Sequence, residues 1–70
     1  MTPTVQVGTV VSFDERVGLG TVEVKGQGSY LFHCTQIADG SRAIDEGTNV
    51  NFVLVARHGG VWEAAELRRV

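Results

Sequence analysis

The chain has 70 residues, a hydrophobic fraction of 43% and a formal net charge of −2, a composition typical of one globular domain rather than a disordered chain. One cysteine excludes an intrachain disulfide, and one Cys with two His at unrelated positions does not supply a four-ligand zinc site. Eight acidic residues against six basic ones argue against tight, sequence-blind binding of duplex DNA. We expect a single domain over residues 1–70 that needs no metal or cofactor.

The N-terminal residues, MTPTVQVG, contain neither the basic patch nor the apolar run of a signal peptide. No stretch of the chain approaches the ~20 apolar residues of a membrane span. The lone cysteine is also typical of a reducing compartment. We therefore expect a cytoplasmic protein without a membrane partner.

Short β-prone segments separated by glycine fill the first half of the chain. Residues 5–13 (VQVGTVVSF) are rich in β-branched side chains, and residues 19–24 (LGTVEV) alternate in polarity, so both are predicted to be strands. Residues 25–28 (KGQG) are typical of a hairpin connection, and residues 29–34 (SYLFHC) are predicted to be a third strand.

The alternation divides the side chains of these segments between two faces, because successive residues of a strand point in opposite directions. One face is predicted to point into a core and carries Val22, Val24, Tyr30 and Phe32. The other face is predicted to point into solvent and carries Leu19, Thr21, Glu23, Leu31 and His33.

The second half of the chain begins with a less regular segment. Residues 35–49 predict a helical turn around residues 36–37 followed by a loop, with Ile37 and Ile44 as apolar plugs. Residues 50–56 (VNFVLVA) predict a fourth strand.

The C-terminal segment, residues 61–70, has the composition of a helix but is predicted to be a strand. The link of residues 57–60 (RHGG) is short enough to return the chain antiparallel beside the fourth strand, and four strands would otherwise leave an open edge. Trp62 either plugs the end of the barrel or offers a stacking ring, and the plug is the favoured interpretation.

Five short strands in a chain of this length predict an all-β fold, a small closed barrel that we expect to be antiparallel throughout. Its stability has to come from a compact apolar core. The predicted core residues are Val10, Val22, Val24, Tyr30, Phe32, Ile37, Val50, Phe52 and Leu54.

The order and spacing of four motifs resemble those of bacterial cold-shock proteins, from about Val7 to Leu67. GTVVSFDERVGLGTVEV is similar to the family's G-x-V-K-W-F-N-x-x-K-G-[FY]-G-F-I, and YLFHCTQI to V-F-V-H-F-S-A-I. IDEGTNVNFVLV is similar to L-x-E-G-Q-x-V-x-F-x-V, and EAAEL to Q-A-x-N-V. The resemblance implies a cold-shock-like OB-fold that binds single-stranded RNA or DNA across its second and third strands, with bases stacked on exposed rings.

The chain departs from the family at those ring positions. The position of the surface Trp is Ser12, and the other ring positions are Leu19, Thr21, Leu31 and Cys34, while only His33 is retained. Two family lysines are replaced by Val11 and Val17. Because a base stacked on a ring is worth about 1–3 kcal/mol, these losses predict weak binding.

Two functions follow as expectations. The first is a non-enzymatic module that binds single-stranded RNA or DNA weakly, through Ser12, Leu19, Thr21, Leu31, His33 and Cys34. The second is a protein-interaction module or homodimer that uses an exposed apolar patch of Val11, Val17, Leu19 and Leu31. Catalysis by Cys34 is not expected, because strand alternation directs the neighbouring His33 to the opposite face.

Overall fold

Residues 5–70 form five strands. A computed structural model of the chain describes residues 5–70, apart from the side chain of His58. The strands are β1 (Val5–Asp14), β2 (Leu19–Val24), β3 (Gly28–His33), β4 (Asn49–Ala56) and β5 (Trp62–Arg69), and the short 3-10 helices are η1 (Cys34–Gln36) and η2 (His58–Gly60). Across residues 5–70, no helix has the length and apolar character needed to cross a membrane. The predicted all-β architecture, including the last strand, is confirmed.

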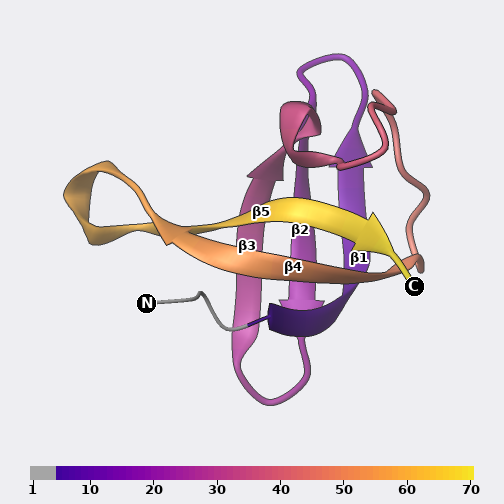
Figure 1. The fold of residues 1–70 in the computed structure, drawn as a ribbon. Helices are drawn as coiled ribbons and strands as arrows, with labels where there is room; N and C mark the ends of the chain where they lie inside the picture. The colour runs from indigo at the N-terminus through magenta and orange to yellow at the C-terminus, as the bar shows by residue number, and fades with distance from the viewer. Residues whose placement is uncertain (1–4) are drawn as a thin grey trace.

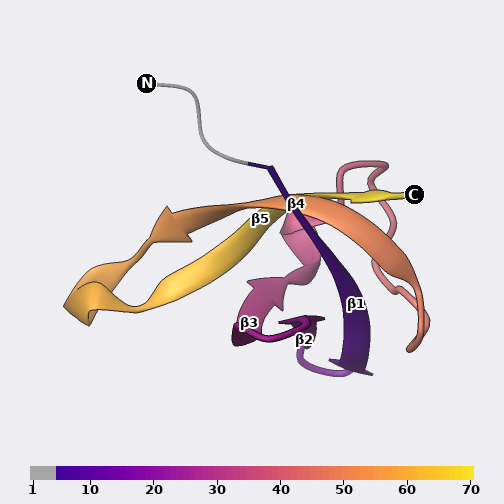
Figure 2. The same ribbon diagram turned by 90° about the horizontal axis from the view of Figure 1, so that it is seen from below.

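The strands form a closed barrel in the order β1-β2-β3-β5-β4. In Figure 1 the β4–β5 hairpin crosses β1, β2 and β3, and Figure 2 shows the hairpin arching over the three strands. Four of the neighbouring pairs are antiparallel, but β3 and β5 are parallel and meet where Leu31 lies opposite Glu63. The prediction of a wholly antiparallel barrel is therefore wrong at this seam. A polarity pattern with a period of two residues reports which face is buried, but not the direction of the neighbouring strand.

Strand β1 belongs to both halves of the barrel. Its first half pairs with β4, from Val5 opposite Val53 onward, and its second half pairs with β2. Between Val10 and Ser12 the register with β2 shifts by one residue, which makes Val11 the extra residue of a β-bulge. A bulge bends a strand and increases its twist, so it lets one strand turn from one layer into the other.

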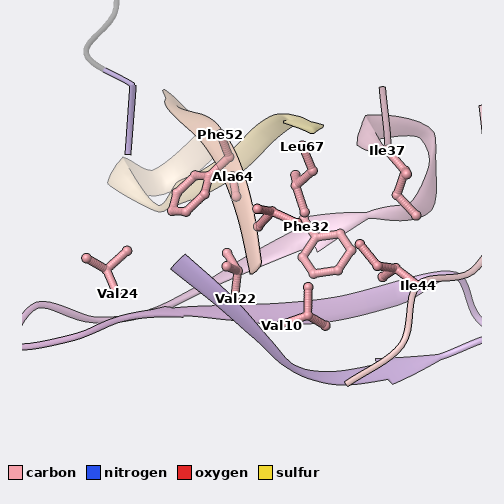
Figure 3. Packing of buried hydrophobic residues seen from close by; sticks show 10 residues of the cluster. Val10, Val22, Val24, Phe32, Ile37, Ile44, Phe52, Ala64 and Leu67 are labelled. Atoms are coloured by element: carbon pink, nitrogen blue, oxygen red, sulfur yellow. The ribbon is translucent and has the colours of Figure 1, made fainter. Parts of the chain in front are cut away.

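The core lies between the hairpin and the three-stranded layer (Figure 3). Most of the predicted core residues are buried, while Tyr30 and Leu54 lie partly buried at the border of the cluster. Ile37 and Ile44 are buried, as predicted for plugs. Three core residues were not predicted, Ala64, Ala65 and Leu67 of β5.

The burial of Leu67 follows from a local irregularity of β5. Glu66 has a φ of 54°, in the left-handed region, and the register between β4 and β5 shifts beside it. Strict alternation from Ala64 would bury Glu66 and expose Leu67, but the structure exposes Glu66 and buries Leu67. The irregularity therefore keeps an apolar side chain in the core.

Trp62 does not plug the barrel, so the favoured interpretation of this residue is wrong. It is 53% exposed and lies opposite Ala56 near the tip of the β4–β5 hairpin. This part of the hairpin extends away from the barrel in both views (Figures 1 and 2), which leaves the indole without a core to enter.

Candidate nucleic-acid interface

The outer face of β1, β2 and β3 carries most of the predicted contact residues. The register aligns Ser12, Thr21 and Leu31 in one row across the three strands. In the next row Leu19 lies opposite His33. Leu19 is 44% exposed and Leu31 is 50% exposed, whereas the side chains that alternate with them, such as Phe32, are buried. The outward orientation predicted for this face is confirmed.

Four of these side chains line one shallow hollow of about 190 Å³, which we call the sheet hollow: Ser12, Leu19, Thr21 and Leu31. Phe13 and Gly20 also line it. The hollow thus combines two aliphatic side chains with two hydroxyl groups. Such a surface offers apolar contact and hydrogen bonds to a flat ligand, but no exposed ring for stacking.

The rim of the sheet hollow is acidic. Asp14 and Glu46 line it, and none of its lining residues is Lys or Arg. At the adjoining seam Glu63, which lies opposite Leu31, is paired with Arg57 at 3.2 Å. Phosphate groups would therefore gain no attraction from the charged side chains that line the sheet hollow.

His33 lies at the end of this face, and its ring is held by the next turn of chain. The backbone amide of Thr35 donates to Nδ1 at 3.3 Å, and the Thr35 hydroxyl lies 3.0 Å from the same nitrogen. Because Nδ1 accepts the amide hydrogen, a neutral ring carries its proton on Nε2. His33 can therefore donate a hydrogen bond from Nε2 to a ligand.

Cys34 does not line the sheet hollow. It is half-buried, packs against the core, and donates its backbone N–H to the carbonyl of Gly18 at 2.8 Å. Its Sγ lies 3.9 Å from Nδ1 of His33, although His33 is exposed and Cys34 packs against the core. β3 ends at His33 and η1 begins at Cys34.

The apolar patch predicted for a protein interface is spread over several elements. Val11 is exposed at the bulge of β1, and Val17 is exposed in the turn between β1 and β2. Of the four predicted patch residues, only Leu19 and Leu31 line the sheet hollow.

A second hollow of about 470 Å³ was not predicted from the sequence, and we call it the turn hollow. It lies between the β1–β2 turn and the segment that follows β3, and Arg16 and Arg42 both line it. Cys34 and Thr35 belong to this hollow rather than to the sheet hollow. The two arginines are far apart in the sequence and no motif joins them, so only the fold brings them to one place.

No protein-family model matches the chain, and no curated protein matches it either. Among residues 5–70 there is also no group of three or more His, Cys, Asp or Glu side chains that could hold a metal ion. Function therefore has to be argued from the barrel and from the two hollows beside β2 and β3.

Proposed function

We propose that the chain is a cold-shock-like OB-fold module, without enzymatic activity, that binds single-stranded RNA or DNA weakly on the outer face of β1, β2 and β3. OB-folds are five-stranded barrels that bind oligonucleotides on the face of the second and third strands. The observation that carries the proposal is that Ser12, Leu19, Thr21 and Leu31 share one open hollow on this face, with His33 at its end.

Binding would depend on apolar contact and hydrogen bonds. Leu19 and Leu31 offer aliphatic surface to the faces of bases, while the hydroxyls of Ser12 and Thr21 and Nε2 of His33 offer hydrogen bonds to base edges or sugars. Each ring that is absent withholds about 1–3 kcal/mol, or about five- to 150-fold in affinity. The proposal therefore includes low affinity and little discrimination between bases.

Restoring one ring tests this proposal directly. Leu31→Phe is expected to raise affinity for octathymidylate about tenfold, because the new ring would lie on the open face where a base can stack. The matched control is Val5→Phe, which adds the same ring to an exposed position of β1 that pairs with β4. Fluorescence anisotropy of a labelled octamer at low salt measures both variants.

The result of this titration can contradict the proposal in two ways. Wild-type protein and Leu31→Phe that both fail to bind at about 100 μM, the weak end of non-specific binding, would refute it. An equal gain for Leu31→Phe and Val5→Phe would show that any exposed ring suffices and that the sheet hollow is not the site.

A second candidate is self-association through the same face, and the acidic rim of the sheet hollow favours it. Asp14 and Glu46 disfavour phosphate there, while Leu19 and Leu31 leave apolar surface uncovered. The double variant Leu19→Lys/Leu31→Lys separates the two candidates. If the face pairs two copies, the variant is expected to abolish a dimer seen by sedimentation. If the face binds a single strand, wild-type protein sediments as a monomer.

A further inference from the structure

The turn hollow is built from two turns that are each fixed by an aspartate. In the β1–β2 turn Oδ1 of Asp14 accepts the backbone amide of Arg16 at 2.9 Å. In the loop after η1, Oδ1 of Asp39 accepts the backbone amide of Ser41 at 2.9 Å, one residue before Arg42. In both turns, the Asp side chain accepts a hydrogen bond from the backbone amide two residues later. This hydrogen bond fixes the backbone at or next to each arginine.

The two walls of the turn hollow are held together by close backbone contact. Gly18 has a φ of 71°, and a Cβ added there would lie 2.9 Å from Sγ of Cys34. The carbonyl of Gly18 also accepts the amide of Cys34. The turn that carries Arg16 is therefore fixed against η1, and the volume of about 470 Å³ falls within the range of ligand pockets.

Arg16 and Arg42 are available for an anionic ligand. Arg57 is paired with Glu63 and Arg69 with Asp39, and neither Arg16 nor Arg42 has an ion-pair partner within residues 5–70. Both side chains are exposed. Glu15 also lines the turn hollow and offsets one of the two charges, so the residues that line it carry one net positive charge. The charge of this hollow is thus opposite in sign to that of the sheet hollow.

The two hollows are adjacent through His33 and Thr35. His33 lies opposite Leu19, which lines the sheet hollow. The ring of His33 bonds Thr35, and Thr35 lines the turn hollow. A single strand of nucleic acid that crosses the sheet hollow toward His33 would therefore continue into the turn hollow.

We infer that the turn hollow binds the sugar–phosphate backbone of the single strand whose bases lie on the sheet hollow, with Arg16 and Arg42 as the phosphate-binding residues. This inference rests on the proposed function. In this arrangement the turn hollow supplies the cationic contact that the sheet hollow lacks. The bases contact an apolar surface, and the phosphates contact a basic one. Guanidinium groups suit this role because their planar donors match phosphate oxygens in pairs.

The salt dependence of octathymidylate binding tests the inference. Each phosphate contact with a single strand contributes about 0.7 to the slope of log K against log salt concentration. Arg16→Gln/Arg42→Gln is therefore expected to reduce the magnitude of that slope by about 1.4 and to weaken binding at low salt by about tenfold or more. Arg16→Lys/Arg42→Lys is expected to retain the slope and most of the affinity, because it keeps both charges.

The matched control is Lys25→Gln/Arg68→Gln, which removes the same two charges elsewhere. Lys25 follows β2, in the turn at the opposite end of the three strands from the β1–β2 turn (Figure 1), and Arg68 is exposed on β5. This control is expected to leave the slope unchanged. Equal losses in the two Gln pairs would overturn the inference but leave the proposed function in place, whereas wild-type protein that binds no octathymidylate would overturn both.

Binding of a mononucleotide tests whether the phosphate in the turn hollow belongs to a nucleic-acid strand or to a free nucleotide. Thymidine monophosphate is expected to bind at least tenfold more weakly than octathymidylate, since it lacks the contacts on the sheet hollow. Amide resonances of Gly18, Gly40 and Ser41, which line the turn hollow, report binding there. Equal affinity for the two ligands, with shifts at these amides alone, would overturn the inference of a strand site.

Discussion

Gly20 is the residue at which the three-stranded layer most clearly limits side-chain size. It lies on the inner side of β2, opposite both Phe13 and Phe32. The two phenyl rings stack with their centroids 5.9 Å apart and an angle of 17° between their planes. A Cβ on Gly20 would lie 2.5 Å from Cζ of Phe32 and 2.8 Å from Cδ1 of Phe13. The hydrogen side chain therefore permits the aromatic stack.

Gly20→Ala is expected to lower the free energy of unfolding by about 1–3 kcal/mol, the usual cost of overpacking a core. Urea denaturation measures the loss. The effect has a steric cause, because Gly20 is not among the residues with positive φ. In the background Phe13→Leu, which trims one of the two rings, the same substitution is expected to cost less. Equal costs in the two backgrounds would contradict this account.

His33 and Cys34 show what could not be predicted about single residues of the site. Alternation correctly assigned Leu19, Thr21, Leu31 and His33 to the outer face, because all four lie within regular strands. Cys34 was placed among the contact residues by the family resemblance instead, but the chain enters η1 at this residue and the thiol turns toward the core. The end of a strand depends on tertiary contacts, here the hydrogen bond from the Cys34 amide to the Gly18 carbonyl. The local sequence does not show such a contact.

At the scale of elements, β5 depends on a residue in an unfavourable backbone conformation. A non-glycine residue in the left-handed region costs about 1–2 kcal/mol. Glu66 adopts this conformation, and its amide lies 3.4 Å from Oε1 of Gln36, the last residue of η1. The surrounding structure maintains the strain because the irregularity keeps Leu67 in the core and Glu66 in solvent.

Glu66→Gly is expected to leave stability unchanged or to raise the free energy of unfolding by up to about 1 kcal/mol, because glycine adopts positive φ without a steric penalty. The matched control is Glu23→Gly, at an exposed position of regular strand in β2, where glycine is expected to cost about 0.5–1 kcal/mol. Urea denaturation of the two variants measures the difference. Equal destabilisation would show that Glu66 is not strained.

The sequence was sufficient to locate the strands but not to arrange them. Every strand end was predicted within one residue, because glycine-rich turns interrupt clear alternation at the β2–β3 and β4–β5 links. The parallel contact between β3 and β5 was missed, since it depends on where the β4–β5 hairpin crosses the other layer. The turn hollow was missed for a related reason, because Arg16 and Arg42 line one hollow only when β3 is paired with β2.

At the scale of the whole molecule, an ion pair ties the loop after β3 to the last strand. Asp39 pairs with Arg69, and Arg69 also donates to the backbone carbonyl of Ala43 at 3.2 Å. Hydrogen bonds from Ser41, first from its side chain and then from its backbone amide, lower the pKa of Asp39 below 3.8, and the charge of Arg69 lowers this pKa further. The folded state therefore favours the charged form of this carboxyl.

Acid is expected to remove the contribution of Asp39 to stability. Because the pKa of Asp39 is lower in the folded chain, its contribution is complete above the unfolded pKa of about 3.9 and disappears as the pH falls through the folded value. Wild-type protein should thus have a higher melting temperature than Asp39→Asn at neutral pH. The gap should be small, because both partners are exposed, and should close in acid. A gap that stays constant from about pH 6 to about pH 2 would contradict this assignment.

The parallel seam has a consequence for partly folded forms of the chain. Among the strands of residues 5–70, β5 alone pairs with both β3 and β4, so it covers one edge of each. Before Trp62–Arg69 docks, or after a cut in the link that precedes it, two strands present unsatisfied backbone groups at the same time. Such edges act as templates for strands of other chains. Docking of the final strand thus determines whether this barrel remains a separate molecule or becomes a seed for aggregation.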